Sequence, residues 1–400
     1  MADLRLGICG DLDWHNTKES LNPLTTMKKD EVKEFLLELN SNPTEKDRLL
    51  ERYPSLEEEI EKLLKLDVLR EEKGTVYVNF TLTDEEDMGI LFDVCESYAE
   101  NLADQIEKNI DVVFDSLEEY ENKKITKEKL SFLMIGCYLL DWGALELIRK
   151  WGIADHRKPQ PGDNEYLLWG ECEVQQSLKE IYWGGHMYEG EKYTFHTFGD
   201  HSEDTKRIAF PDLIYEFDKM SFEGNKEYKS LLFDKRVELL EELGNILDII
   251  GKSGKKKDEL FNEVNNDSLS NSLDLLKKLG YIEKNNEKYY LSIPYFESQD
   301  TQLIFEAISP LLPIIKEWME DNLDRLEDDV AEIKPIKNGV PFEEVYIQIW
   351  HYIFGLTNKK LAGRGIIYDT YSDPLHKGYL PGLFKGDVLE RVEDRLVNEA

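Results

Sequence analysis

Basic and uncharged polar side chains gather between Lys252 and Lys288, in a chain whose formal net charge is −34. Eight lysines in this stretch slightly outnumber its seven acidic residues. Lysines can neutralise phosphates, and asparagine or serine at a helix start can hydrogen-bond base edges. The alternative is a solvated helix start, where the same polar residues are favoured as caps. The candidate DNA-binding residues are Lys255, Lys256, Lys257, Asn265, Asn266, Ser268, Ser270, Asn271, Lys284 and Lys288.

Three histidines of the central segment, His186, His196 and His201, stand near Asp200 and Asp204. These residue types suit zinc. Their spacing matches neither H-E-x-x-H nor a cysteine-histidine finger. We therefore expect surface polar groups, with no metal and no cofactor, and keep a metal-dependent enzyme of this segment as a remote alternative.

Two similar loops, "HRKPQPGDNEYLLWGE" and "DTYSDPLHKGYLPGLFKGD", share proline, glycine and aromatic residues. The simpler interpretation is a shaped turn that packs back on its own domain. The functional alternative is a partner or ligand groove lined by Tyr166, Trp169, Tyr379 and Phe384. No glycine-rich phosphate loop, nucleophile elbow or Ser/His/Asp arrangement is visible, so we expect no catalytic residues and no enzyme activity.

The elements that would position these residues occur twice. The pattern of Ile60 to Phe92 returns from Leu273 to Phe305 at a constant offset of 213 positions. The match resumes, with a few residues inserted, between "WGIADHRKPQPGDNEYLLWGE" and "RGIIYDTYSDPLHKGYLPGLFKGD". A period this long indicates a duplicated domain, because solenoid units are roughly 20–50 residues long.

Each copy has the order of helix, helix, helix and two-stranded ribbon. In the first copy the ribbon turns at Lys73-Gly74, and in the second at Asn285-Asn286. The phrase "LLKKLGYIEKNNEKYYLSI" closely resembles winged helix-turn-helix regulators. That resemblance covers about 60 residues of each copy. It implies a mainly α fold with small β-hairpins (α+β), and a function in either DNA binding or protein docking.

The third helix of the first copy carries Glu57, Glu58, Glu59 and Glu61, where a DNA-reading helix would meet phosphates. At a few ångströms, even a well-screened like charge costs on the order of 1 kcal/mol. Several such charges together would abolish binding. We therefore expect that only the second copy could bind DNA.

The predicted domains are a first repeat (1–170), a central aromatic-rich β segment (171–221) and a second repeat (222–400). Within the central segment, "KYTFHTF" and "RIAFPDLIYEF" flank "GDHSED" and predict a β-hairpin. A long acidic amphipathic helix and a further apolar helix follow each ribbon. Such helix pairs commonly form dimer seams, so a homodimer is a further hypothesis.

The strong negative charge repels nucleic acid and anionic membranes, since both are bound through lysine and arginine. No run is apolar enough to predict a membrane span, and the first residues lack a signal-peptide pattern. Four scattered cysteines without a CxxC pair suggest a reduced, cytoplasmic protein. The favoured hypothesis is therefore a non-enzymatic regulatory or interaction protein that binds a basic protein partner. The alternative is a transcriptional regulator that reads DNA with its second repeat.

Overall fold

The computed structural model describes residues 4–11, 21–155, 157–161, 164–172, 181–200, 207–212, 226–264 and 269–399. The fold is mixed α+β with several small sheets, as the sequence predicts. Two compact units are present, and each is drawn from three stretches of chain. Unit one comprises Met1–Ala99, Leu145–Lys179 and Glu317–Ile353, and unit two comprises Glu100–Ala144, Glu180–Lys316 and Phe354–Ala400. These units group residues by contact, so the predicted repeat boundaries at 170 and 221 stay a prediction.

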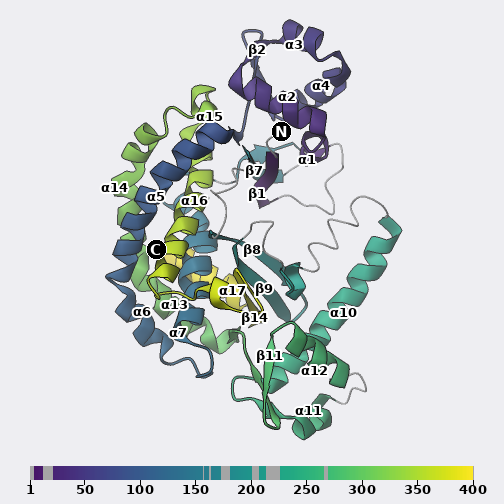
Figure 1. The fold of residues 1–400 in the computed structure, drawn as a ribbon, viewed down its shortest axis with the longest axis vertical. Coiled ribbons are helices and arrows are strands. Elements are labelled where there is room, and N and C mark those ends of the chain that lie inside the picture. The colour runs from purple at the N-terminus through teal and green to yellow at the C-terminus, as the bar shows by residue number, and fades with distance from the viewer. Residues whose placement is uncertain are drawn as a thin grey trace. The chain divides into compact units, whose positions relative to one another are not determined.

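Residues 30–78 of unit one form three helices and a three-stranded sheet, which we name the first head (Figure 1). The amphipathic helices and the strands bury one shared apolar core, which includes Phe35, Ile60 and Val76. The strand order is β2-β4-β3. The elements are α2 (Asp30–Ser41), β2 (Thr44–Glu45), α3 (Lys46–Arg52), η2 (Pro54–Leu56), α4 (Glu57–Lys65), β3 (Leu69–Glu72) and β4 (Thr75–Val78).

Residues 237–291 of unit two repeat this arrangement, and we name them the second head. Their strand order is β10-β12-β11, the counterpart of β2-β4-β3. Leu243, Leu273 and Tyr281 lie in its core. The elements are α10 (Lys226–Ile250), β10 (Lys255–Lys256), α11 (Lys257–Val264), α12 (Leu269–Lys278), β11 (Ile282–Asn285) and β12 (Lys288–Leu291).

Backbone details of the two heads coincide at the offset seen in the sequence. Helix α4 stops where Val68 N–H donates to Leu63 O at 3.0 Å, and α12 stops where Tyr281 N–H donates to Leu276 O at 2.9 Å. These are the bonds of a left-handed helix stop. The residues with positive φ pair up as Asp67 with Gly280, Lys73 with Asn286, and Gly152 with Gly365. The predicted ribbon turn at Lys73-Gly74 is present, whereas the second turn lies one residue later than predicted, at Asn286-Glu287 rather than Asn285-Asn286.

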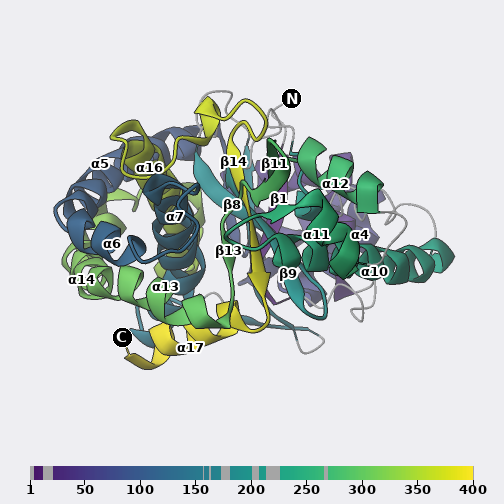
Figure 2. The ribbon, with the colours of Figure 1, turned by 90° about the horizontal axis from the view of Figure 1, so that it is seen from below.

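A second small sheet accompanies each head. In unit one, β7 (Asn164–Cys172) lies between β1 (Leu4–Asp11) and β5 (Thr81–Thr83). In unit two, β14 (Tyr379–Lys385) lies between β9 (Tyr193–Asp200) and β13 (Tyr295–Phe296), as Figure 2 shows. Strand β7 is antiparallel to β1 and parallel to β5, and β14 is likewise antiparallel to β9 and parallel to β13. The two sheets therefore have the same topology.

The central segment contains a hairpin, but its strands differ from the prediction. Strand β8 (Tyr182–Glu189) pairs with β9, so the turn lies at 190–192 rather than around "GDHSED". Residues 210–212 are helical, and 201–206 and 213–225 lie outside the described residues. The prediction missed β8 because glycines 184 and 185 interrupt its alternation.

The remaining elements are mostly helices that follow the heads. In the first half these are α1 (Leu24–Met27), α5 (Glu85–Glu107), α6 (Ile110–Leu117), α7 (Lys127–Ser131), the π-helical η3 (Phe132–Gly143), α8 (Ala144–Lys150) and the short strand β6 (Pro159–Gln160). In the second half they are η4 (Ser298–Asp300), α13 (Thr301–Ile308), η5 (Ser309–Leu311), α14 (Leu312–Asp329), α15 (Lys334–Lys337), α16 (Phe342–Gly363), η6 (Thr370–Ser372) and α17 (Val388–Glu399).

Contrary to the sequence prediction that no run is apolar enough for a membrane span, one continuous helical stretch, Lys127–Lys150, has the length and apolar composition of such a span. In the folded chain 89% of its apolar window is buried. That is the environment of a core helix, and the structure gives no indication of a membrane.

Candidate functional site

The lysines predicted to bind DNA are spread over the short sheet and the first helical turn of α11. Lys255 Nζ lies 2.6 Å from Glu263 Oε1, so this lysine is already paired within the head. Lys257 Nζ lies 5.4 Å from the centre of the Phe261 ring, and Lys284 Nζ lies 5.6 Å from that of Tyr289. Local contacts therefore hold three of the candidate lysines.

Lys256 and Lys288 are brought together by the strand register. They stand directly opposite each other in the β10–β12 pair. Like charges in this position are unfavourable, and a bound anion would relieve their repulsion. These two lysines are the part of the second head best suited to a phosphate.

Of the uncharged polar candidates in the second head, only two lie among the residues that the structure describes. Ser270 and Asn271 lie exposed near the start of α12. Asn265, Asn266 and Ser268 lie outside the described residues. The first turn of α12 therefore has two exposed, uncharged polar side chains, between the buried Leu269 and Ser272.

Helix α4 of the first head presents carboxylates at the corresponding place. Glu57 and Glu58 are exposed. Glu59 accepts a hydrogen bond from Lys29 Nζ at 2.7 Å, and Glu61 forms an ion pair with Lys46 at 2.9 Å. These lysines lower the pKa of both Glu59 and Glu61. Glu59 and Glu61 are therefore held in their charged form at neutral pH.

The aromatic groove is the part of the prediction that the structure contradicts. Tyr166, Tyr379 and Phe384 are completely buried. Phe384 stacks on Phe296, with ring centres 5.4 Å apart. The half-buried Trp169 covers Gly7, where a Cβ would lie 2.2 Å from its ring. Because β7 and β14 are inner strands of their sheets, their side chains fill cores and cannot line a groove.

The repeated loop of unit two does pack back on its own unit. His376 Nε2 lies 2.6 Å from the carbonyl oxygen of Leu279, at the end of α12. A Cβ on Gly280 would lie 2.3 Å from the His376 ring. This is the turn-packing interpretation, with glycine required by close approach as well as by its positive φ of 76°.

The central histidines are held by protein groups. His186 Nδ1 lies 2.7 Å from Asp212 Oδ1, and Arg207 Nη1 lies 3.2 Å from the same oxygen. The backbone carbonyl of Asp200 accepts a bond from Arg207 Nε at 3.2 Å. His201 and Asp204 lie outside the described residues. Among the described residues, no three His, Cys, Asp or Glu side chains are grouped as metal ligands would be.

A buried cysteine–histidine contact joins η3 to β9. Cys137 Sγ lies 3.5 Å from His196 Nε2, and both residues are fully buried. Burial raises the pKa of the thiol well above its usual value and lowers that of the imidazole to about 3. Both groups are therefore neutral, and this pair lacks the thiolate that a nucleophile needs.

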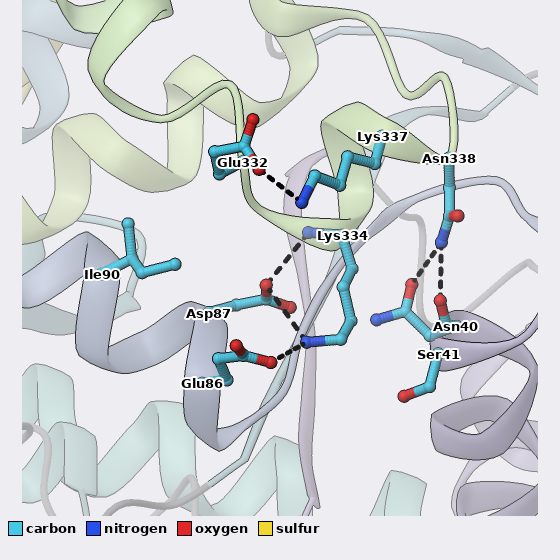
Figure 3. A pocket seen from close by; sticks show the side chains of 9 residues that line it. All are labelled: Asn40, Ser41, Glu86, Asp87, Ile90, Glu332, Lys334, Lys337 and Asn338. Atoms are coloured by element: carbon cyan, nitrogen blue, oxygen red, sulfur yellow. Dashed lines mark hydrogen bonds and ion pairs between the residues drawn. The ribbon is translucent and has the colours of Figure 1, made fainter.

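Unit one contains a polar pocket of about 310 Å³ beside the first head (Figure 3). Its centre is Lys334, whose Nζ lies 2.9 Å from Asp84 and 3.0 Å from Glu86. The backbone N–H of Lys334 donates to Asp87 Oδ1 at 3.0 Å. Burial raises the pKa of Asp87. Burial also opposes the charge on Lys334, but hydrogen bonds to Asp84 and Glu86 raise its pKa overall.

The other polar groups of this pocket also bind one another. Asn338 Nδ2 donates to the Asn40 carbonyl at 2.8 Å, and Lys337 Nζ lies 2.7 Å from Glu332. The pocket is therefore a charged seam between the first head and residues 332–338. The sequence pattern did not single out this seam, although Asp87 lies within the range that repeats at the constant offset.

The exposed side of α14 carries a dense row of acidic side chains. From residue 317 onward its apolar side, with Trp318, Met319 and Leu326, is buried. The exposed carboxylates, which we name the acidic face of α14, are Glu317, Glu320, Asp321, Asp324, Glu327, Asp328 and Asp329. Arg325 is the single basic residue in this part of the helix.

The acidic side chains Glu100, Asp104 and Glu107 of α5, which we name the α5 stripe, differ from the acidic face of α14 because basic side chains of unit two pair with them. Arg364 contacts Glu100, Asp104 and Glu107, and its distance to Asp104 is 2.9 Å. Lys360 Nζ lies 2.7 Å from Glu100. Two cations therefore pair with three carboxylates on α5. On the acidic face of α14, one arginine stands against seven carboxylates.

Comparisons of this chain with family models, with curated proteins and with solved structures gave no match.

Proposed function

We propose that this chain is a non-enzymatic interaction protein built from two repeats, each with a winged helix-turn-helix head, and that it binds a basic protein partner. The shared strand orders and the helix stops at matching positions support the duplication. Binding is assigned to carboxylates because they dominate the exposed helix surfaces. No disulfide joins the four cysteines, all of which lie in the described residues, and this supports a cytoplasmic location.

The acidic face of α14 is the observation that carries the proposal. Seven exposed carboxylates stand against one arginine on a helix whose opposite side is fixed in a core. A rigid row of like charges attracts a surface of opposite sign and accelerates its association. The same field repels nucleic acid, which removes the simplest alternative use of such a surface.

Neutralising this face should release the partner. We expect the variant Glu320→Gln/Asp324→Asn/Glu327→Gln to lose roughly tenfold in affinity, since three screened contacts contribute about 0.5 kcal/mol each. Affinity capture with the full chain, followed by quantitative mass spectrometry, measures the loss. The expected partner has a basic surface.

A matched control removes three charges from the α5 stripe. The variant Glu100→Gln/Asp104→Asn/Glu107→Gln should retain the captured partner, because Arg364 and Lys360 already pair with these three carboxylates and offset most of their charge. A captured set that does not change with the α14 variant, or that consists of acidic proteins, would contradict the proposal.

DNA binding by the second head is the second candidate function. The Lys256–Lys288 pair and the uncharged first turn of α12 favour it. The paired Lys255 weakens it, as does the charge of −34 on the whole chain. We therefore rank it below protein binding.

A further inference from the structure

Each compact unit contains the head of one repeat and helices of the other. Unit one holds the first head together with Glu317–Ile353, which follows the second head in sequence. Unit two holds the second head together with Glu100–Ala144, which follows the first head. Subtracting 213 from 317–353 gives 104–140, which lies inside the stretch contributed to unit two. The exchange is therefore reciprocal.

The helices that cover the two small sheets show the exchange directly. In unit one, α16 of the second repeat covers β7 of the first, and Tyr352 Oη donates to the buried Glu171. In unit two, η3 of the first repeat covers β14 of the second, where the rings of Tyr138 and Phe384 lie 5.6 Å apart. Glu171 stands opposite Thr83 of β5 and Phe384 opposite Phe296 of β13, and this shared register places Glu171 and Phe384 at matching positions.

The segments that touch the wing strands are exchanged in the same way. In unit one, Arg70 of β3 donates to the carbonyl of Asn338, from the second repeat. In unit two, Glu283 of β11 is paired with Lys124, from the first repeat. Arg70 and Glu283 are again at matching positions. Lys124 Nζ also lies 3.7 Å from the Tyr290 ring centre.

Each unit has a buried carboxylate at the same place. The charges around it indicate which head can pack against which helical segment. Asp87 is neutralised by Lys334 from the opposite repeat. Asp300 is neutralised at 2.7 Å by Lys252 of its own head, while Glu121 of the opposite repeat occupies the position of Lys334. Ser41, the counterpart of Lys252, stands three residues before the first strand of its head.

Unexchanged pairing would leave these charges unbalanced. The first head would meet Glu121 beside Asp87, with Ser41 supplying no cation. The second head would gain Lys334 in addition to Lys252. A buried carboxylate without a cation is costly, so this pattern selects the exchanged arrangement over the unexchanged one.

We infer that the two repeats are each other's binding partners and form a segment-exchanged pair fused into one chain. The surface that each repeat offers is its small sheet and wing, and the partner that fits is the helical segment of a second copy. This inference rests on the proposed duplication but not on the proposed partner binding. Its test measures only whether the two pieces of the cut chain associate.

A cleavable chain tests the exchange. A recognition sequence for a site-specific protease is inserted between Gln176 and Ser177 of the full chain, which separates the repeats when cut. Because both folded units need both pieces, the urea midpoint of the cut protein should rise with protein concentration. The uncut protein should show no such dependence. A cut protein whose midpoint ignores concentration, or whose pieces separate in native buffer, overturns the inference.

A cross-linking experiment tests whether the two segments that we infer to be in contact do lie next to each other. In the cleavable chain, Lys124→Cys/Glu283→Cys treated with a short bismaleimide reagent should give a link that joins the two pieces on a denaturing gel. The control Lys46→Cys/Glu61→Cys forms its bond inside one piece and should leave the pieces separate. Pieces that separate in both variants overturn the inference.

Discussion

At the scale of single residues, a lysine beside a buried aspartate is the decisive interaction of each unit. Asp87 and Asp300 accept the backbone N–H of the residue three positions earlier, at 3.2 Å and 2.7 Å. Burial raises the pKa of Asp87, and the nearby Lys334 opposes this effect. Different elements supply the lysine in the two units, since Lys334 begins α15 and Lys252 precedes β10.

Moving the lysine beside Asp87 from position 334 to position 41 should preserve most of the stability of unit one. We expect Lys334→Glu to cost about 3 kcal/mol of unfolding free energy, because it leaves Asp87 buried beside a second acid. Adding Ser41→Lys should recover at least half of this loss, since it copies the arrangement of Lys252 and Glu121. Urea denaturation of the single and double variants measures both effects.

Lys337→Glu on the same short helix is the matched control. Lys337 is half exposed and its partner Glu332 is largely exposed, so its loss should cost less than about 1 kcal/mol. A double variant no more stable than Lys334→Glu alone would refute the cation exchange.

At the scale of elements, local chemistry explains which parts of the fold could be predicted. The third helix of the second head ends at Gly280, the two-stranded ribbons turn at Lys73 and Asn286, and all three residues have positive φ; turn signals of this kind are local. The pairing of β1 with β7 and of β9 with β14 depends on residues more than 150 positions apart. No periodicity within a short window reports such pairing, and the aromatic groove was wrong for this reason.

The π-helical segment η3 contains the buried carboxyl of Asp141, and it should give the protein a pH-dependent stability. Burial raises the pKa of this group well above its ordinary value. The folded chain thus holds a proton that the unfolded chain releases. This contribution is complete below the unfolded pKa and is lost as pH rises toward the folded pKa.

Asp141→Asn should therefore stabilise the protein at neutral pH and leave its stability near pH 4 unchanged. Within the window, each pH unit should add about 1.4 kcal/mol to the difference between variant and parent. Denaturant titrations across this range measure the difference. A constant difference at all pH values would show that Asp141 does not hold the proton.

At the scale of the whole molecule, the sequence predicts a duplication but not how the two proposed repeats share their parts. The offset of 213 is visible because both copies kept their apolar pattern. The exchange leaves no such trace, since a helix buries the same apolar face against either sheet. Charge differences at matching positions, such as Lys334 against Glu121, were the available signal.

Net charge also belongs to this scale and separates the two candidate functions. A protein of −34 must overcome its own field before the Lys256–Lys288 pair can hold a phosphate. The same negative field attracts a basic protein partner. The ranking of protein binding over DNA binding depends on this difference.

Anisotropy of labelled duplex DNA of mixed sequence, titrated with the full chain at low ionic strength, tests that ranking most directly. We predict no saturable binding with a dissociation constant below roughly 10⁻⁴ M, the weak end of non-specific DNA binding. Saturable binding that weakens with salt, and whose salt slope falls in a Lys256→Glu/Lys288→Glu variant, would contradict the account and establish the second head as a DNA reader.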